Sequence, residues 1–478
     1  MMDDPTGLHP SPAAARDPPE IRMRHSFKPH LLIALAVASL LPLVAWPCFT
    51  SQRAQVLEKQ HPDLEFESLA HQMHRQSQIA YDFSGPADCV DGSADGFSCR
   101  SVRLAGWLPL QDIGGGANGS DNWGWVHRDS GRMFALMGRS NGVAFVEITD
   151  PENPVYIGNL PRPAGVAEDV WTDVKTYRDH AYVVADSVSG QGIQVFDLRR
   201  LLDPGSELPV TFDQDAHFTG FDSAHNIAIN EQSGYAYAVG SNLCAGGLLM
   251  VDIRQPQDPQ YAGCYDGDGY THDVQCVIYH GPDADYQGRE ICLASNEDSV
   301  TIVDVTDKAE PVQVGRHTYA GSQYTHQGWL TEDQRYFLVD DELDEFRDDL
   351  EGTRTLVFDF ASLDTAPPPA EYIADGLAID HNQYVIGDFV FQANYERGVR
   401  ILRIDDAGSG LLTEVAYFDT FPGRSDLDFQ GAWNVFPYFG NNIILVSDYN
   451  RGLFILEVTD ANIARALWAE IFGDRFEP

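Results

Sequence analysis

Four histidines recur along the chain at intervals of about 50 residues. Each one precedes or opens a short apolar run that is typical of a β-strand: His225, His272, His326 and His381. Because neutral imidazole is the commonest metal ligand, four such side chains on one axis could bind Zn, Cu or another transition-metal ion. The alternative, which we favour, is a hydrogen-bonded ring that joins neighbouring repeats around ordered water.

A second candidate for ion binding is the acidic stretch from Asp340 to Glu345, with Asp348 and Asp349 beyond it. Carboxylate oxygens are hard ligands that suit Ca²⁺, but the stretch lacks the spacing of an EF-hand loop. A solvated surface loop is the alternative, and we prefer it. The sequence has no Gly-x-Ser-x-Gly, His-Glu-x-x-His or P-loop motif, so the common hydrolase and nucleotide-binding signatures are missing.

The histidines belong to a repeat whose most regular part is a strand of the type Val-x-Ile-Val-Asp. Seven copies occur: Val143 to Asp150, Ile193 to Leu198, Leu248 to Ile253, Val300 to Asp307, Thr355 to Phe360, Val399 to Ile404 and Leu453 to Asp460. Their spacing of about 40 to 55 residues is that of propeller blades. We therefore predict an all-β fold, a β-propeller of seven four-stranded blades. The stretch Arg103 to Leu110 resembles a fourth strand and is predicted to close the ring by completing the last blade.

Aligned on this strand, every copy has a polar residue at the start of its first strand and another at the end of its second. The first set, the channel-mouth ring, is Asn122, Thr172, His225, His272, His326, His381 and Gln430. The second ring is Asn141, Asp186, Asn242, Asn296, Asp341, Asn394 and Asp448. Because antiparallel strands reverse direction, both rings are expected on one face, where binding residues collect. Asn and Asp also favour turns, so we expect turn residues rather than ligands in the second ring.

The chain of 478 residues contains 72 Asp and Glu against 31 Lys and Arg, which gives a formal net charge of −41. A field of this sign repels phosphate backbones and attracts metal cations, so we expect no nucleic-acid partner. The acidity also keeps an extracytoplasmic surface soluble.

The N-terminal region resembles an export signal. Arg22, Arg24 and Lys28 precede an apolar run from Leu31 to Trp46, which contains Pro42 and is short for a membrane span. A cleaved signal is therefore favoured over an anchor, and a membrane contact is expected only if this segment stays uncleaved. We assign residues 1–50 to a signal or targeting segment, 51–86 to a helical or irregular leader arm, 87–460 to the propeller and 461–478 to a C-terminal tail.

Six cysteines follow Cys48, an even number in a chain predicted to enter an oxidising compartment. Proximity in the sequence suggests the pairs Cys89 with Cys99, Cys244 with Cys264, and Cys276 with Cys292. Because no Cys-x-x-Cys occurs, a zinc knuckle or a thioredoxin-like role is not expected.

Several longer phrases also resemble a known family. The Val-Asp-Val and Val-Glu-Ile strands resemble LVIVD repeats, and YTHDVQCVIYHGPDADYQGREIC, YTHQGWLTEDQRYF and LTEVAYFDTFP resemble the choice-of-anchor B family of bacterial exported proteins. The likeness spans about Ala87 to Leu456. It implies a periplasmic, cell-surface or secreted β-propeller whose biochemical role is unassigned. Glu470 to Pro478 is polar, so a C-terminal anchor is not expected.

We therefore expect an exported, monomeric binding or interaction module that presents one propeller face to a protein or small-molecule ligand. The alternative is a metal-dependent enzyme, a hydrolase rather than an oxidoreductase, that uses the histidines of the channel-mouth ring. An enzyme is the less favoured of the two.

Overall fold

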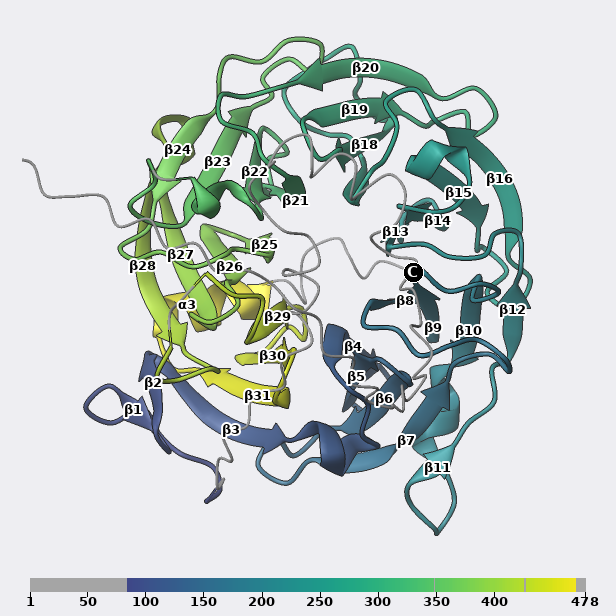
Figure 1. Cartoon of the computed structure of the whole chain (residues 1–478), viewed down its shortest axis with the longest axis vertical. Coiled ribbons are helices and arrows are strands. Elements are labelled where there is room, and N and C mark those ends of the chain that lie inside the picture. The colour runs from purple at the N-terminus through teal and green to yellow at the C-terminus, as the bar shows by residue number, and fades with distance from the viewer. Residues whose placement is uncertain (1–83, 348, 425–426, 470–478) are drawn as a thin grey trace, which may run out of the picture. The chain divides into compact units, whose positions relative to one another are not determined.

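Seven antiparallel sheets surround a common axis in the computed structural model, which describes residues 84–347, 349–424 and 427–469. The first strand of each sheet lies toward the centre and the fourth lies at the rim (Figure 1). The predicted fold class, a propeller of seven four-stranded blades, is confirmed. The signal segment and almost all of the leader arm lie outside the described residues.

The strands of the first three blades have the following bounds. Blade one is β4 (Gly119–His127), β5 (Arg132–Arg139), β6 (Gly142–Glu147) and β7 (Val155–Pro161); blade two is β8 (Thr172–Tyr177), β9 (His180–Ala185), β10 (Ile193–Asp197) and β12 (Ala216–Phe218); blade three is β13 (Asn226–Asn230), β14 (Tyr235–Val239), β15 (Leu248–Asp252) and β16 (Gln260–Tyr265).

The remaining four blades follow the same order. Blade four is β17 (Asp273–Ile278), β18 (Glu290–Ser295), β19 (Val300–Asp304) and β20 (Val312–His317); blade five is β21 (Thr325–Leu330), β22 (Tyr336–Asp341), β23 (Arg354–Asp359) and β24 (Ala370–Ile373); blade six is β25 (Asn382–Ile386), β26 (Phe389–Ala393), β27 (Val399–Asp406) and β28 (Leu411–Phe418); blade seven is β29 (Ala432–Phe436), β30 (Ile443–Asp448), β31 (Gly452–Val458) and β3 (Val102–Leu108).

The seven predicted copies of the regular strand are the third strands of the seven blades. They are apolar on both faces because each sheet is packed between two others. In β19 every residue is buried. Ile302 packs in a cluster with side chains of blade five, whereas its neighbour Val303 packs in a cluster with side chains of blade three. Since successive side chains of a strand point to opposite faces, one strand supplies the core on both sides.

The ring is closed by β3, as predicted. This strand pairs antiparallel with β31, with Val102 opposite Val458 and Leu108 opposite Leu453. Trp107 of β3 stacks on Phe454 and donates from Nε1 to the carbonyl of Arg451 at 2.8 Å. The last blade therefore contains strands from both ends of the propeller segment.

A few elements extend the blades. β1 (Ser93–Ala94) and β2 (Phe97–Arg100) continue the sheet of blade six, and β11 (Val210–Thr211) pairs parallel with β7. α3 (Ala461–Ala469) lies in the predicted tail and packs Ile463 and Leu467 into a core cluster. The short 3-10 helices are η2 (Leu110–Ile113), η3 (Leu198–Leu202), η4 (Cys244–Gly246), η5 (Asp344–Phe346) and η6 (Ala407–Ser409).

All three predicted disulfides are present. Cys276 and Cys292 face each other across β17 and β18, Cys244 in η4 bonds Cys264 in β16, and Cys89 bonds Cys99 in β2. Each bridge joins segments that are close in sequence, so the pairing by proximity is confirmed.

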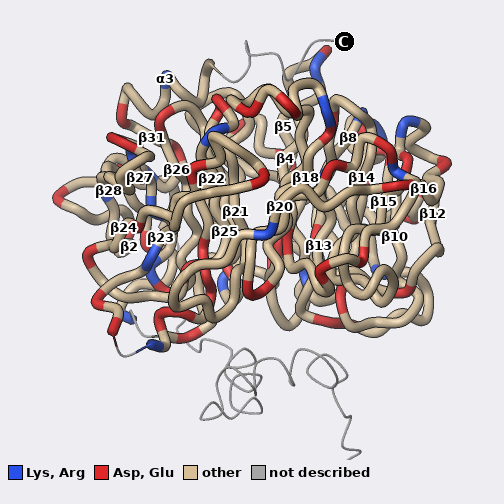
Figure 2. The backbone as a smooth tube through the Cα atoms, turned by 90° about the horizontal axis from the view of Figure 1, so that it is seen from above, with Lys and Arg blue, Asp and Glu red and all other residues tan. Residues whose placement is uncertain are grey.

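Asp and Glu positions are distributed along the backbone across the edge-on view of the propeller (Figure 2). This distribution fits a solvated acidic surface. Within the described residues, no helix is long and apolar enough to cross a membrane.

Candidate metal centre

The four histidines lie side by side near the propeller axis. His225, His272 and His381 come immediately before the first strands of blades three, four and six, and His326 is the second residue of β21 in blade five. Successive ring centroids are 4.3, 4.1 and 4.4 Å apart. All four side chains are buried, with exposed fractions of 5% or less. The structure therefore brings together the four histidines that the repeat alignment singled out.

Every one of these imidazoles uses Nδ1 for a hydrogen bond within the protein. Two bonds go to carboxylates, from His225 to Asp186 at 2.9 Å and from His326 to Asp340 at 3.1 Å. The other two go to backbone carbonyls, from His272 to His326 at 3.0 Å and from His381 to Trp433 at 2.6 Å. A carbonyl or carboxylate partner requires a proton on Nδ1, so in each neutral ring Nε2 carries the lone pair.

Three of the four bonds also join neighbouring blades. Asp186 belongs to blade two and His225 to blade three; His272 and His326 belong to blades four and five; His381 and Trp433 belong to blades six and seven. The Nδ1 hydrogen bonds therefore form the ring that joins neighbouring blades. This role is compatible with a metal on the Nε2 side, because the two nitrogens of an imidazole bond independently.

Glu342 completes the site; in the sequence it belongs to the acidic stretch considered for Ca²⁺, but the sequence did not place it beside the histidines. Its carboxylate oxygens lie 3.8 Å from Nε2 of His326 and 3.8 Å from Nε2 of His381. The ligand atoms of these three residues all lie within 4.8 Å of one another, close enough to share one ion. The hydroxyl of Tyr395 donates to Glu342 Oε1 at 2.8 Å and orients the carboxylate.

Burial determines the charge state of His381. Removal from water is the main cause that lowers the pKa of His381 to about 3; the hydrogen bond to Trp433 opposes this shift, and repulsion by His225 adds to it. The imidazole is therefore neutral at physiological pH, which is the form that binds metal.

An aromatic cover packs against the histidines from the loops of the same face. It is formed by Val170, Trp171, Tyr324, Leu343, Ile379, Tyr395, Phe429, Trp433 and Tyr449. The ring of Tyr324 is 5.3 Å from that of His272, and the ring of Trp433 is 4.4 Å from that of His381. This cover makes the site a buried centre, whereas the sequence suggested an open channel mouth.

A charged layer lies beside the histidines along the first strands. Lys175 donates to Asp121 at 2.9 Å and also contacts Asp173. Burial raises the pKa of the nearby Asp273 to about 7. The cavity that these residues and the four histidines line has a volume of about 20 Å³. This volume holds one water molecule or one ion and excludes an organic substrate.

The other members of the channel-mouth ring make structural contacts. Asn122 donates to the carbonyl of Asn434 at 2.9 Å, and Thr172 donates to the carbonyl of Arg139 at 2.9 Å. Oε1 of Gln430 accepts a hydrogen bond from the side-chain amide Nδ2 of Asn450 at 2.6 Å. Thr172 lines the cavity with the histidines, whereas Asn122 and Gln430 do not.

Most members of the second ring are engaged with local backbone. Asp448 accepts from the amides of Asn450 and Arg451, and Asn242 accepts from the amide of Asp222. Asn141 donates to the carbonyl of Gly114, and Asn296 donates to Asp268. Asp341 accepts from the backbone amides of Gln323 and Tyr324. The backbone amide of Asn394 donates to the carbonyl of Gly398. Asp186 differs from these residues because it bonds an imidazole.

The expectation of a solvated loop at Asp340 to Glu345 is wrong. Asp340, Asp341, Asp344 and Glu345 have exposed fractions of 1% or less, and of the stretch beyond them Asp349 is exposed. The physical reason is that the chain after β22 turns inward under the aromatic cover, where Leu343 is anchored. Alternating charge and composition alone do not reveal such an inward turn.

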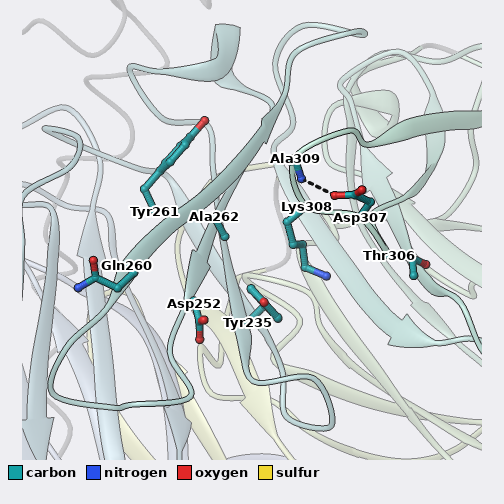
Figure 3. Close-up of a pocket in the computed structure, with 9 residues that line it drawn as sticks. All are labelled: Tyr235, Asp252, Gln260, Tyr261, Ala262, Thr306, Asp307, Lys308 and Ala309. Atoms are coloured by element: carbon teal, nitrogen blue, oxygen red, sulfur yellow. Dashed lines mark hydrogen bonds between the residues drawn. The ribbon is translucent and has the colours of Figure 1, made fainter.

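A larger groove lies away from the axis, between β16 and the loop after β19 (Figure 3). Its volume is about 580 Å³. Lys308, which lines it, donates to Glu290 at 2.6 Å and to the carbonyl of Val305 at 2.7 Å. The hydrogen bond drawn in Figure 3, from the amide of Ala309 to Asp307, belongs to a turn. The charged groups of this groove are therefore already engaged in the fold.

No protein-family model matches the sequence, and a search of curated proteins found no match. Similar solved structures include the Cps50 (Swd1) β-propeller domain of Myceliophteria thermophila, with a TM-score of 0.45 and 13% identity over 70% of this chain and 96% of that one. A functionally unknown protein from Desulfotomaculum acetoxidans DSM 771 has a TM-score of 0.40 and 13% identity over 63% and 89% of the two chains. The periplasmic gluconolactonase PpgL of Pseudomonas aeruginosa has a TM-score of 0.44 and 15% identity over 63% and 88%. Likenesses at this level carry no information about the chemistry of the site.

Proposed function

We propose that this protein is an exported β-propeller that binds one transition-metal ion at its axis. The ligands are Nε2 atoms of His225, His272, His326 and His381, together with the carboxylate of Glu342. The observation that carries the proposal is that four adjacent imidazoles all direct Nδ1 to a protein acceptor. Metal-binding histidines are held in this way, because the second hydrogen bond fixes both the tautomer and the ring orientation.

The ligand set favours a metal of intermediate softness. Imidazole suits Zn²⁺, Cu²⁺, Ni²⁺ and Fe²⁺, whereas Ca²⁺ and Mg²⁺ require oxygen ligands. The carboxylates of buried Asp340 and part-buried Asp186 accept hydrogen bonds from His326 and His225, and this makes the two imidazoles stronger metal ligands. Zn²⁺ and Cu²⁺ are therefore the first ions to test.

The cavity and its cover support binding rather than catalysis. A hydrolase needs room for a substrate beside the metal, and the cavity at the histidines has a volume of about 20 Å³. The aromatic cover blocks approach from the face on which the histidines lie. We therefore place the metal-dependent hydrolase second and the binding module first, with any protein or small-molecule partner contacting the outer surface of that face.

Three observations support export. Three disulfides indicate an oxidising compartment. The charged and apolar N-terminal pattern and the resemblance to choice-of-anchor B proteins agree with a periplasmic, cell-surface or secreted location.

Elemental analysis tests the proposal. The purified mature chain is incubated with Zn²⁺ or Cu²⁺, dialysed extensively and analysed for metal by mass spectrometry. We expect near-stoichiometric metal in the wild type and its loss in the double variant His272→Ala/His326→Ala, with circular dichroism to verify folding. The matched control is His127→Ala, which removes a partly exposed imidazole bonded to Ser130 and keeps the metal. A wild type that dialyses free of metal, or a double variant that retains it, contradicts the proposal.

A further inference from the structure

A lysine of the charged layer lies between two buried carboxyl groups. Asp121 is in β4 of blade one, whereas Asp173 and Lys175 are in β8 of blade two. Nζ of Lys175 is 2.9 Å from Oδ2 of Asp121 and 2.5 Å from Oδ1 of Asp173. The side chain of the lysine is 16% exposed, and those of the two aspartates are 7% and 5% exposed. One amino group therefore contacts two carboxyl groups in a place that water hardly reaches.

The two carboxyl groups have different partners on their other oxygens. Oδ2 of Asp173 accepts a hydrogen bond from the backbone amide of Ile227 at 2.7 Å. Oδ1 of Asp121 accepts from the side-chain amide of Asn434, which belongs to β29 of blade seven. A donor on Oδ1 of Asp121 polarises the carboxyl group and stabilises negative charge that develops on this oxygen. The carboxyl carbon of Asp121 is therefore prepared for attack by a nucleophile on its Oδ2 side, where Lys175 lies.

The two carboxyl groups also differ in protonation. Burial and then repulsion by Asp173 raise the pKa of Asp121 well above its ordinary value. Burial acts to raise the pKa of Asp173 as well, but attraction by Lys175 and hydrogen bonds outweigh it and lower this pKa. Burial acts to lower the pKa of Lys175, and the two carboxylates raise it above its ordinary value. At neutral pH the three groups are therefore a carboxylic acid, a carboxylate and an ammonium ion.

Aromatic rings surround these groups. Nζ of Lys175 lies 4.8 Å from the ring centroid of Trp123. The ring of Tyr384 is 5.9 Å from that of Trp123, and Tyr384 is 3% exposed. Charged groups are costly in such surroundings, whereas a neutral amide that keeps its hydrogen bonds is not. The environment therefore favours any reaction that removes the ion pair.

We propose that Lys175 and Asp121 form an intramolecular isopeptide bond that joins blades one and two. Asp173 takes a proton from Nζ, and the resulting amine attacks Cγ of Asp121. The Nζ–Cγ bond forms, the Cγ–Oδ2 bond breaks, and Oδ2 leaves as water. The amide nitrogen keeps one proton, the water carries two and Asp173 keeps the last, so atoms and charge balance. The reaction consumes no oxidant, reductant or other reactant.

Proximity accounts for a condensation that does not proceed in dilute solution. Groups held in a productive orientation react as if at effective concentrations of about 10⁵ to 10⁸ M. The base in contact with Nζ is required, because Lys175 begins as an ammonium ion and only the free amine is a nucleophile. Asp173 cannot be replaced by solvent in this role, since the site is buried.

A second buried ion pair lacks these features and provides a comparison. Nζ of Lys308 is 2.6 Å from Glu290, and the two side chains are 9% and 6% exposed. Glu290 also accepts from Asn230 at 2.8 Å and from the hydroxyls of Ser233 and Tyr237 at 2.6 and 2.5 Å. These donors favour the ionised carboxylate, and no second described carboxylate contacts Lys308 to act as base. We therefore expect this pair to stay ionic.

The isopeptide bond has a structural role that the disulfides do not fill. Each of the three disulfides has a sequence separation of 20 or less. Asp121 and Lys175 are 54 residues apart and belong to the innermost strands of different blades. A covalent link of this length restricts the unfolded chain more than a short loop does, and it also resists reduction.

Intact-mass spectrometry tests the inference. The purified mature chain, with its N-terminus identified by sequencing, is denatured and all disulfides are reduced. We expect the wild type to be lighter than its sequence mass by one water molecule, and tandem mass spectrometry of a digest to find a branched peptide that joins Lys175 to Asp121. Denaturation removes any bound metal, so the result does not depend on the proposed metal centre. A wild type of full sequence mass, or a branch at Asp173, overturns the proposal.

Three variants, each verified as folded by circular dichroism, assign the roles. Lys175→Met removes the nucleophile and Asp173→Asn removes the base, so both should have the full sequence mass. Lys308→Met removes the comparison lysine and should keep the mass deficit of the wild type. A deficit that persists in Lys175→Met or Asp173→Asn, or one that disappears in Lys308→Met, contradicts the proposed chemistry. The branched peptide of the wild type remains decisive if a variant does not fold.

Discussion

Asp186→Asn changes the proposed transition-metal centre without removing a ligand. Oδ2 of Asp186 accepts the Nδ1 hydrogen of His225 at 2.9 Å, and the two side chains are 13% and 6% exposed. Asparagine has nearly the same size and retains a carbonyl oxygen, but it lacks the negative charge that makes the imidazole of His225 a stronger metal ligand. Loss of such an outer partner weakens metal affinity by about 10- to 100-fold. In free energy this corresponds to about 1.4 to 2.7 kcal/mol.

The affinity is measured by competition with a chelator of known Zn²⁺ affinity at fixed pH. Asp448→Asn is the matched control, since Asp448 occupies the same position in blade seven but accepts from the amides of Asn450 and Arg451. We expect the control to lower stability and to leave the Zn²⁺ affinity unchanged. An Asp186→Asn protein that binds Zn²⁺ as tightly as the wild type would refute the assigned hydrogen-bond role, and so would an equal loss in Asp448→Asn.

The remaining predictions concern stability. Replacing Cys276 and Cys292 by Ala opens a loop with a sequence separation of 16. We expect the free energy of unfolding, measured by urea denaturation under non-reducing conditions, to fall by about 3 kcal/mol. This fall should be no larger than the fall that reduction of all disulfides causes in the wild type. An unchanged free energy of unfolding contradicts a stabilising bridge. Burial raises the pKa of Asp169 to about 7, above the ordinary unfolded value of about 3.9. Because the folded state then keeps a proton that the unfolded chain has lost, the free energy of unfolding should fall as pH rises from about 4 to 7. Asp169→Asn should flatten that pH dependence, since each unit of difference between the folded and unfolded pKa corresponds to about 1.4 kcal/mol. An unchanged slope of unfolding free energy against pH contradicts the raised pKa of Asp169.

The propeller could be predicted from the sequence because its main features repeat or are local. The Val-x-Ile-Val-Asp strands recur with the period of a blade, and a strand packed between two sheets must be apolar on both faces. The closing strand β3 was predictable since a ring with an unpaired edge is unfavourable. The helix α3 was missed because it has only 9 residues and lies beyond the last repeat, so the repeat pattern does not mark it.

The candidate site was predicted only in part. Alignment of the repeats placed the histidines on one axis, because equivalent residues of equivalent blades occupy equivalent positions. Glu342 escaped this reasoning since it follows the repeat and lies in a turn of blade five alone. The aromatic cover and the burial of Asp344 depend on contacts between loops of several blades, which a repeat pattern does not encode.

The pairing of β3 with β31 sets an order of events during biogenesis. β3 is synthesised before the seven-blade repeat begins, but its partner β31 is synthesised last. A nascent chain that lacks β31 is therefore an open arc with unpaired sheet edges at both ends. Trp433 and Tyr449, which help to seal the axis, also arrive with the final blade. An ion held at that axis would therefore distinguish a finished ring from every unfinished one.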